Sequence, residues 1–307
     1  MINQNLDPIY QDLDFSLFMP ELPEVETIRS DLEKRIVGEK ISGLEIRDQK
    51  LLEKGSSWKG IEGRRVKGLE RRGKLLILVL EKEIFILVHL KMTGQLVYQD
   101  GKELVAGGHS LDKSDLFQGV GGELPNKHTR AIIHFQSGAV LFFNDLRRFG
   151  YLKPVTKQEK EEKLTEFGPE PLMPDFDLLD FQKKLKKRKI AVKKALLDQK
   201  LVAGLGNIYV DEVLFLSGIR PERSAESLKS NEIKALYSAI IKILKQGVKY
   251  RGTTFSDYVD ARGKAGNFSR FLKVYNRGGR PCQRCDGSIK KIKLAGRGTH
   301  YCPGCQK

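Results

Sequence analysis

In the first half of the chain, hydrophobic residues recur at helical spacing over residues 24–36, and Gly38 follows that segment. Short apolar or alternating runs then predict strands at 41–47, 75–80, 84–90, 131–135 and 139–143. The last two runs flank Ser137 and Gly138, which is typical of a hairpin turn. Because a single early helix precedes a series of strands, we expect a β-sandwich in the N-terminal half.

The pattern changes in the second half. Residues 100–126 are rich in glycine and predict a loop excursion, and the prolines of residues 167–175 predict a linker. Beyond the linker, apolar residues at helical spacing predict helices at roughly 177–200, 206–217, 224–232 and 232–249. The sequence therefore predicts an α+β chain in which a β-sandwich is followed by a helical part.

The charge balance indicates a polyanionic partner. The 307 residues include 55 Lys and Arg against 39 Asp and Glu, which gives a formal charge of +16 and a pI near 9.6. Such a charge favours nucleic acid ahead of an anionic membrane surface. The apolar runs are too short to cross a bilayer, and residues 1–18 contain three acids and no Lys or Arg, the reverse of a secretory signal. We therefore expect a reducing, cytoplasmic setting.

All four cysteines lie near the C-terminus, in the pairs Cys282-x2-Cys285 and Cys302-x2-Cys305, which sixteen residues separate. Two such knuckles can place four thiolates on one tetrahedral Zn²⁺. A four-cysteine site leaves no ligand position open, so we expect one structural zinc ion that holds a small β-hairpin and performs no chemistry.

The segment from Met19 to Glu26 reads MPELPEVE. If translation starts at Met19 and the methionine is removed, Pro20 carries a free secondary amine. An α-amino group has a pKa of about 8, so a useful fraction is unprotonated in the cell. Such an amine can attack a sugar carbon and form a Schiff base, and Glu21 and Glu24 lie close behind it in the sequence. The alternative is that the prolines only mark the entry to a helix whose dipole favours nearby acids.

Two segments of the second half suggest contacts with a polyanion. Residues 183–194 read KKLKKRKIAVKK, with eight bases among twelve residues, and include Lys189. Gly204 and Gly206 then precede a helix start that could receive a phosphate, and Asn207 would either cap that helix or contact DNA. Solvated charges and an ordinary helix cap are the alternatives.

The other candidate site residues are isolated in the sequence, and each could also be an ordinary surface or core residue. Phe149, beside Arg147 and with Met92 on another turn, could fill a gap in a duplex after a base is flipped out, or it could belong to the core. Lys74 and His128 could be ordinary surface residues. The finger residue Arg297 could be a solvated charge, or it could bind a phosphate or a flipped base.

Together these residues resemble the bacterial formamidopyrimidine-DNA glycosylases, a family of 8-oxoguanine glycosylases and AP lyases. The resemblance runs from Met19 to Lys307. It rests on PELPEVET, the lysine of RRGK, HLKMTG, KHTR, LRRFG, FGPEPL, LVAGLGNIYVDE, RGTTFSDYVD and the closing four-cysteine finger. The related endonuclease VIII-type enzymes also begin with Pro-Glu, but the PELPEVE form favours the formamidopyrimidine branch.

The resemblance implies a role for each candidate. Pro20 would attack C1′, Glu21 would be the general acid and base, and Glu24 would support the ribose or a water. Lys74 would contact phosphates and donate a proton in β-elimination, and Arg297 would serve δ-elimination. The implied DNA contacts are His128, Arg147, Lys189 and Asn207, and the implied void-filling residues are Met92, Arg147 and Phe149. Residues 252–266 would form a loop that closes over the flipped base.

The resemblance also implies the architecture and the partner. We expect an extension at 1–18 that is disordered or not translated, a catalytic β-sandwich domain at 19–155 with a long N-terminal helix, and a linker at 156–176. A helix–two-turn–helix DNA-binding domain at 177–270 and a zinc finger at 271–307 would follow. The partner would be double-stranded DNA with oxidised bases, bound by a monomer, and no cofactor other than zinc is required.

Two departures from the family pattern matter. Leu146 stands where the family has proline, which should alter a turn. With residues 1–18 attached, the Pro20 nitrogen is a tertiary amide and is not nucleophilic. We therefore hypothesise that Met19 is the true start or that the tail is removed. Two alternatives stay open: a glycosylase for oxidised pyrimidines, or a non-catalytic lesion-DNA binder that keeps its extension.

Overall fold

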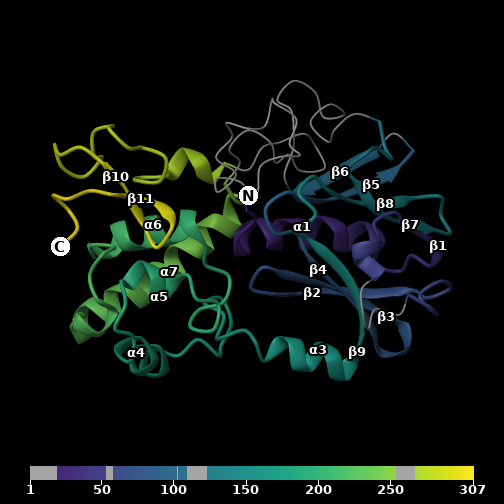
Figure 1. The fold of residues 1–307 in the computed structure, drawn as a ribbon, viewed down its shortest axis with the longest axis horizontal. Coiled ribbons are helices and arrows are strands. Elements are labelled where there is room, and N and C mark those ends of the chain that lie inside the picture. Colours follow the sequence, from purple (N-terminus) through teal and green to yellow (C-terminus); the bar gives the residue numbers. More distant parts are fainter. Residues whose placement is uncertain (1–18, 53–57, 102, 109–122, 254–266) are drawn as a thin grey trace.

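The computed structural model describes residues 19–52, 58–101, 103–108, 123–253 and 267–307. Two sheets occupy the right-hand half of Figure 1 and helices the left-hand half, and α1 (Leu22–Ile36) extends from the centre into the sheet half. The predicted extension at 1–18 and most of the predicted closing loop at 252–266 lie outside the described residues.

The N-terminal half is a sandwich of two antiparallel sheets. One sheet has the order β1-β7-β8-β5-β6 and the other the order β2-β3-β4-β9. The strands of the first are β1 (Ile41–Ile46), β7 (Thr129–Phe135), β8 (Val140–Asp145), β5 (Gly94–Asp100) and β6 (Glu103–Gly108). The strands of the second are β2 (Val66–Arg72), β3 (Leu75–Leu80), β4 (Ile84–His89) and β9 (Tyr151–Thr156).

The sandwich core forms because alternate residues of each strand point inward. Leu76 and Leu78 of β3 and Leu141 and Phe143 of β8 belong to one buried cluster. Helix α1 adds its apolar face to the same cluster and packs against β2 and β6. The expected sandwich with a long early helix is therefore confirmed.

The predicted loop over residues 100–126 is wrong for residues 103–108, which form β6 and pair along β5. Glycine was a misleading signal there. A Cβ at Gly107 would lie 2.6 Å from Ile28 Cγ1, so this glycine lets the strand approach α1 instead of breaking the chain into a loop. Residues 109–122 lie outside the described residues.

The second half is helical, as predicted, but two of the predicted helices are wrong. The segment 177–200 holds two short helices because residues near Ala191 leave the helix and bridge to Ser224. The segment 224–232 holds only a single 3₁₀ turn before the next helix begins. The elements are α3 (Lys157–Leu164), α4 (Leu178–Lys186), α5 (Val192–Leu196), α6 (Asn207–Ser217), η5 (Ala225–Ser227), α7 (Ser230–Lys249) and η6 (Phe268–Phe271). Of the described helices, none is both long and apolar enough to cross a membrane.

A hairpin of β10 (Lys290–Leu294) and β11 (Arg297–Tyr301) carries the cysteine pairs and packs on α6. Asp211 of α6 binds both the hairpin and α5. The Asp211 carboxylate lies 2.6 Å from Lys193 Nζ of α5 and accepts the backbone N–H of His300 at 2.8 Å. Both charged side chains are fully buried. The α+β architecture, with an N-terminal sandwich, a helical part and a four-cysteine hairpin, is thus as expected.

The buried pair predicts a large effect when one partner is removed. Asp211→Ala should lower the free energy of unfolding by about 3–5 kcal/mol, because it leaves the Lys193 ammonium unpaired in the interior. Urea unfolding followed by circular dichroism measures this. The double variant Lys193→Met/Asp211→Leu should recover part of the loss, and a cost below about 1 kcal/mol for the single variant would contradict the analysis.

Candidate active site

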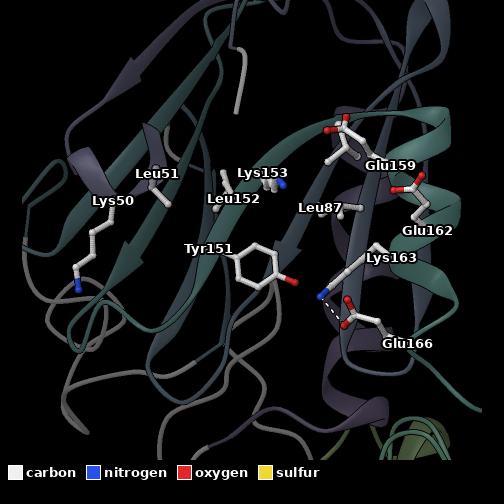
Figure 2. Close-up of a pocket in the computed structure, with 11 residues that line it drawn as sticks. Lys50, Leu51, Leu87, Tyr151, Leu152, Lys153, Glu159, Glu162, Lys163 and Glu166 are labelled. Carbon is white, nitrogen blue, oxygen red and sulfur yellow. Dashed lines mark hydrogen bonds and ion pairs between the residues drawn. The ribbon is translucent and has the colours of Figure 1, made fainter. Parts of the chain in front are cut away.

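A cavity of about 570 Å³ lies between α3, β9 and the 3₁₀ turn η3 (Gln49–Leu52) (Figure 2). Its three lysines and three glutamates balance in charge, and Lys163 is paired with Glu166 at 2.7 Å. Burial raises the pKa of Tyr151, which points toward this pair, to about 12. None of the predicted site residues lines this cavity, so we look for the active site elsewhere.

Another cavity, of about 230 Å³, lies where several segments meet. They include the entry to α1, the β2–β3 turn, the end of β4, the start of α6 and the start of β11. The lining residues are Met19, Glu21, Lys74, His89, Lys91, Phe167, Leu197, Gln199, Gly206, Asn207 and Arg297. Pro20 is buried between Met19 and Glu21. The structure therefore brings Glu21, Lys74, Asn207 and Arg297 together beside Pro20.

Glu21 is the most perturbed acid of the cavity. Its Oε1 accepts the backbone N–H of Ile208 at 2.9 Å, and its buried Oε2 has no hydrogen-bond partner among the described residues. Burial raises its pKa from 4.5 to about 7, against the lowering effect of the nearby Lys74 charge. A carboxyl group with this pKa can give or take a proton near neutral pH.

Lys74 lies close to this carboxyl and is only 7% exposed. Burial lowers the pKa of Lys74 against the raising effect of the Glu21 and Glu24 charges, and the neighbouring positive charges of Arg297 and Lys91 lower it further. Gly206 permits the close packing here. A Cβ at Gly206 would lie 2.3 Å from the Glu21 carboxyl carbon and 2.6 Å from Lys74 Nζ, so no other residue fits without displacing one of them.

Glu24 lies beneath the cavity and does not line it. One oxygen accepts the Glu21 backbone N–H at 3.0 Å. The other accepts the Tyr209 hydroxyl at 2.8 Å and the backbone and side chain of Thr253 at 2.6 and 3.0 Å. Both oxygens are therefore engaged with protein groups, and the predicted contact of Glu24 with a ribose or a water stays a prediction.

Asn207 begins α6 but does not cap it, since Gly206 occupies the cap position. Its Nδ2 donates to the Gly298 carbonyl at 3.0 Å, which also accepts Lys193 Nζ at 3.1 Å. Its buried Oδ1 has no hydrogen-bond partner among the described residues. These two bonds hold the hairpin backbone next to Arg297 against the start of α6, so the guanidinium lines the cavity.

The predicted void-filling residues lie together on two adjacent turns. Arg147 Nη1 is 3.6 Å from Met92 Sδ, and the guanidinium carbon lies 4.8 Å from the Phe149 ring centre. Phe149 is 48% exposed, which rules out the core alternative. Thr93 Oγ1 accepts the Arg147 backbone N–H at 3.0 Å, across the turn in which Leu146 replaces proline. The turn is therefore intact despite this departure.

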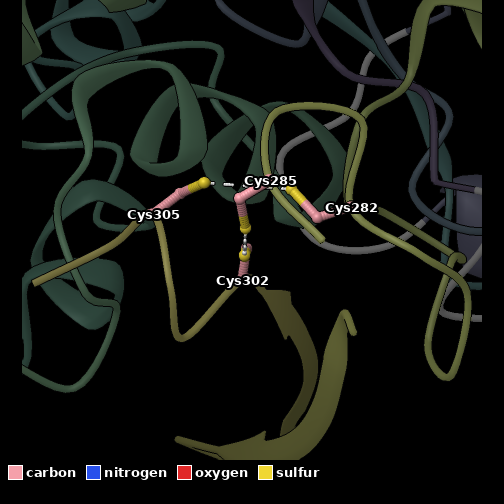
Figure 3. Close-up of side chains that lie close together, drawn as sticks. All are labelled: Cys282, Cys285, Cys302 and Cys305. Carbon is pink, nitrogen blue, oxygen red and sulfur yellow. Dashed lines mark hydrogen bonds between the residues drawn. The ribbon is translucent and has the colours of Figure 1, made fainter. Parts of the chain in front are cut away.

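The four cysteines converge in the hairpin (Figure 3). Their Sγ atoms all lie within 4.8 Å of one another, and the pairs Cys282–Cys305 and Cys285–Cys302 are 3.9 and 3.5 Å apart. Tetrahedral Zn²⁺ with Zn–S bonds of about 2.3 Å requires S···S distances of roughly 3.8 Å. The thiol set therefore fits a bound zinc ion.

Comparisons with known proteins identify the family of the chain. Three family descriptions match the chain: "Formamidopyrimidine-DNA glycosylase N-terminal domain" at 19–152, "Formamidopyrimidine-DNA glycosylase H2TH domain" at 167–259, and "Zinc finger found in FPG and IleRS" at 279–307. The formamidopyrimidine-DNA glycosylase of Desulfitobacterium hafniense (strain DSM 10664 / DCB-2) is 42% identical over 294 residues, covering 94% of this chain and 100% of the relative. The chain belongs to the formamidopyrimidine-DNA glycosylase family.

Further members of the glycosylase family give the same result. The Listeria monocytogenes serovar 1/2a enzyme is 40% identical over 94% of this chain and 100% of its own length. The solved complex of Lactococcus lactis FPG with Fapy-dG containing DNA has a TM-score of 0.79 at 36% identity. The solved complex of MutM with carbocyclic 8-oxo-G containing DNA has a TM-score of 0.78 at 36% sequence identity. Each covers 94% of this chain and 100% of the solved chain. The predicted family resemblance is confirmed.

The glycosylase site contains two residues that sequence reasoning missed, His89 and Lys91. Burial lowers the pKa of His89 to about 3, helped by the charges of Lys91 and Lys74. Its Nδ1 accepts the Lys91 backbone N–H at 3.0 Å, so the neutral ring carries its proton on Nε2. The signal was their position at the end of an apolar strand, since His89 is the last residue of β4 and Lys91 follows shortly after it.

The remaining predicted contacts lie away from the cavity lining. Lys189 is exposed between α4 and α5, and His128 is half-buried in the turn before β7. The basic run at 183–194 is not uniformly a polyanion contact, because Lys193 is buried against Asp211. The roles of Lys189 and His128 stay predictions.

The raised pKa of Glu21 predicts a cost in stability. Its pKa is about 7 in the folded chain against 4.5 ordinarily, so the folded state loses stability as the pH rises from about 4.5 to 7. At about 1.4 kcal/mol per unit the full loss is about 3 kcal/mol. Glu21→Gln should therefore raise the melting temperature at pH 8 and have little effect at pH 4.5.

Glu26, on the same helix, is the matched control. Burial raises its pKa, but hydrogen bonds from Arg29 and Arg71 outweigh burial and hold the pKa below its usual value. Glu26→Gln should therefore lower the melting temperature at pH 8. Equal effects of Glu21→Gln at both pH values would contradict the assignment.

Proposed function

We propose that this chain is a bifunctional DNA glycosylase of base-excision repair, which removes oxidised purines such as 8-oxoguanine and formamidopyrimidines and then cleaves the strand at the abasic site. The observation that carries the proposal is the Glu21 carboxyl, buried beside Pro20 and Lys74, with one free oxygen and a pKa of about 7. Solved relatives hold DNA that contains Fapy-dG or 8-oxo-G, which supports this substrate class.

Base loss would begin at the Pro20 nitrogen. A free secondary amine attacks C1′, and the C1′–N bond forms as the bond from C1′ to the damaged base breaks. Protonated Glu21 can supply the proton that the leaving base or the opening sugar oxygen takes up. The nitrogen then loses its proton and its lone pair expels the ring oxygen O4′, which is protonated as the C1′–O4′ bond breaks. The resulting iminium at C1′ is the Schiff base, which withdraws electrons from the neighbouring carbon.

Strand cleavage would follow from that intermediate. Loss of a C2′ proton breaks the bond to the 3′-phosphate, and a second elimination breaks the bond to the 5′-phosphate. Lys74 and Arg297, whose positive charges line the cavity, are suited to bind the two flanking phosphates and to donate protons to leaving oxygens. Both bonds are then broken at one nucleotide, which leaves a one-nucleotide gap.

The proposal requires a free Pro20 amine. With Met19 attached, the nitrogen is an amide, and the Met19 side chain lies in the cavity that the sugar must enter. The match to the family begins at residue 19, and the aligned relatives are covered over their whole length. We therefore propose that the active form begins at Pro20.

DNA binding would use the exposed Phe149, with the half-buried Met92 and Arg147 beside it, to fill the space left by a flipped base. His128, Lys189 and Asn207 would contact phosphates, supported by the formal charge of +16. We keep the monomer that the family resemblance implies. We keep the domain limits 19–155, 177–270 and 271–307, and one structural zinc ion, whose thiolate ligands suit the cytoplasm.

A trapping experiment tests the nucleophile. Protein made from Met19 and trimmed to Pro20 should give a borohydride-stable adduct with a duplex that contains one 8-oxoguanine, because the imine is reduced in place. Protein that keeps residues 1–19 should give none. Mass spectrometry of both proteins defines the N-terminus of the trapped species. Equal trapping by the untrimmed chain would overturn the mechanism.

Two further arms separate the alternatives. Trimmed Glu21→Gln should excise 8-oxoguanine about 10²–10⁴-fold more slowly, because it lacks the acid, while still forming an adduct with a preformed abasic site. A parallel duplex with an oxidised pyrimidine reports the other substrate class. Preference for that duplex would favour endonuclease VIII-type specificity, and DNA binding without any adduct would favour a non-catalytic binder.

Zinc removal is the second test. Metal analysis should find about one zinc per chain, and a chelator or Cys302→Ser should weaken DNA binding strongly, because the hairpin that carries Arg297 loses its fixed shape. Far-ultraviolet circular dichroism should change little, since the helical core does not depend on the metal. Zinc addition to the chelated protein should restore binding, and unaltered binding by metal-free protein would contradict the structural role.

A further inference from the structure

Glu170 is fully buried but does not line the catalytic cavity. It belongs to the segment that follows α3. One of its oxygens accepts Arg71 Nη2 at 2.6 Å, and the other accepts the Gly73 backbone N–H at 2.7 Å. Gly73 forms the β2–β3 turn together with Lys74, and Arg71 lies near the end of β2 that leads into this turn. Glu170 therefore holds the turn that delivers Lys74 to the site.

Arg71 extends this network to α1. Its side chain is 6% exposed, and its Nε donates to Glu26 of α1 at 2.8 Å. Its Nη1 donates to the Gly73 carbonyl at 3.0 Å. One guanidinium thus joins the helix that carries Glu21, the turn that carries Lys74 and the buried Glu170. An ammonium group on a flexible stem could not reproduce these planar, diverging bonds.

The same turn packs against the segment that leads into α6. Gly73 has a positive φ of 57°, and a Cβ there would lie 3.1 Å from the Gly204 nitrogen. Two backbone bonds fix the Glu170 segment to this region: Gly168 N–H donates to the Gln199 carbonyl at 2.8 Å, and Ala203 N–H donates to the Pro169 carbonyl at 3.0 Å. Glu170 is therefore anchored to the C-terminal half while it binds the N-terminal half.

We propose that Glu170 and Arg71 act as positioning residues that fix the β2–β3 turn against the start of α6 and so hold the Lys74 ammonium beside the Glu21 carboxyl. The inference deepens the proposed function and rests on it for its effect on catalysis. The positive charge of Lys74 favours the ionised form of Glu21. A turn that relaxes away from α6 withdraws this charge, so the Glu21 proton is held more tightly and the phosphate contact of Lys74 is misplaced.

The test variant is Glu170→Gln, which keeps the shape of the side chain but places an amide N–H against one of its two donors. The matched control is Asp175→Asn, because Asp175 lies in the same segment and its ion pair with Arg72, at the end of β2, is partly exposed and therefore worth little. Asp175 Oδ1 also accepts the Glu170 backbone N–H at 3.4 Å, and asparagine keeps this acceptor. Arg71→Lys is the second variant, and it removes the planar bridge while keeping the charge.

Two measurements are made on protein that begins at Pro20. The first is a pH titration of labelled carboxyl groups by carbon-13 NMR, without DNA. The titration midpoint of Glu21 should lie at higher pH in Glu170→Gln and in Arg71→Lys, and it should not change in Asp175→Asn. Single-turnover excision of 8-oxoguanine at neutral pH should fall by about tenfold to a hundredfold in the first two, since a displacement of about 1 Å can have such an effect. The dissociation constant for a duplex with a stable abasic analogue should change less than about threefold.

The outcomes separate the two proposals. If wild-type protein excises nothing but the Glu21 midpoint moves as expected, the proposed function fails and the positioning role stands. If wild-type protein is active and both variants keep its midpoint and its rate, the positioning role is overturned. Parallel loss of rate and DNA affinity with an unmoved midpoint would also overturn it, because general loosening of the fold would then explain the loss. If Glu170→Gln does not fold, Arg71→Lys decides.

Discussion

The entry to α1 and the start of α6 hold each other, and the catalytic cavity depends on this contact. Glu21 accepts the Ile208 N–H, and Leu22 N–H donates to the Gly204 carbonyl at 3.1 Å. The carboxylate thereby satisfies a free N–H at a helix start, where the helix dipole favours negative charge. Burial opposes the same charge and is the stronger effect, since the pKa rises to about 7. The contact therefore joins the two halves and sets the proton affinity of the acid.

What the sequence could predict was carried by local patterns. The cysteine spacing gave the zinc hairpin, the alternation of apolar residues gave the sandwich strands, and the helical period gave α1, α6 and α7. The PELPEVE segment, with the lysine of RRGK and the finger arginine, gave residues that the structure brings to one cavity. These signals are readable because each depends on residues that are close in the chain or on a strongly specific motif.

The rest depends on contacts between distant segments. Gly107 looked like a loop residue, but it is small because Ile28 packs on it. Lys193 looked like one more base in a basic run, but it is buried because Asp211 lies eighteen positions further on. Glu170 had no local signal for its buried surroundings at all. In each case the residue type is explained by a contact with a distant residue, and that contact exists only in the folded chain.

Gly206 is a position at which the packing around the cavity leaves no space for a side chain. Its α-carbon lies so close to the acid and the ammonium group that any side chain must push one of them aside. Glu21 also bonds to the Ile208 N–H, so the same displacement would loosen the junction between α1 and α6. Catalytic geometry and the cohesion of the two halves thus depend on the absence of a single methyl group at this position.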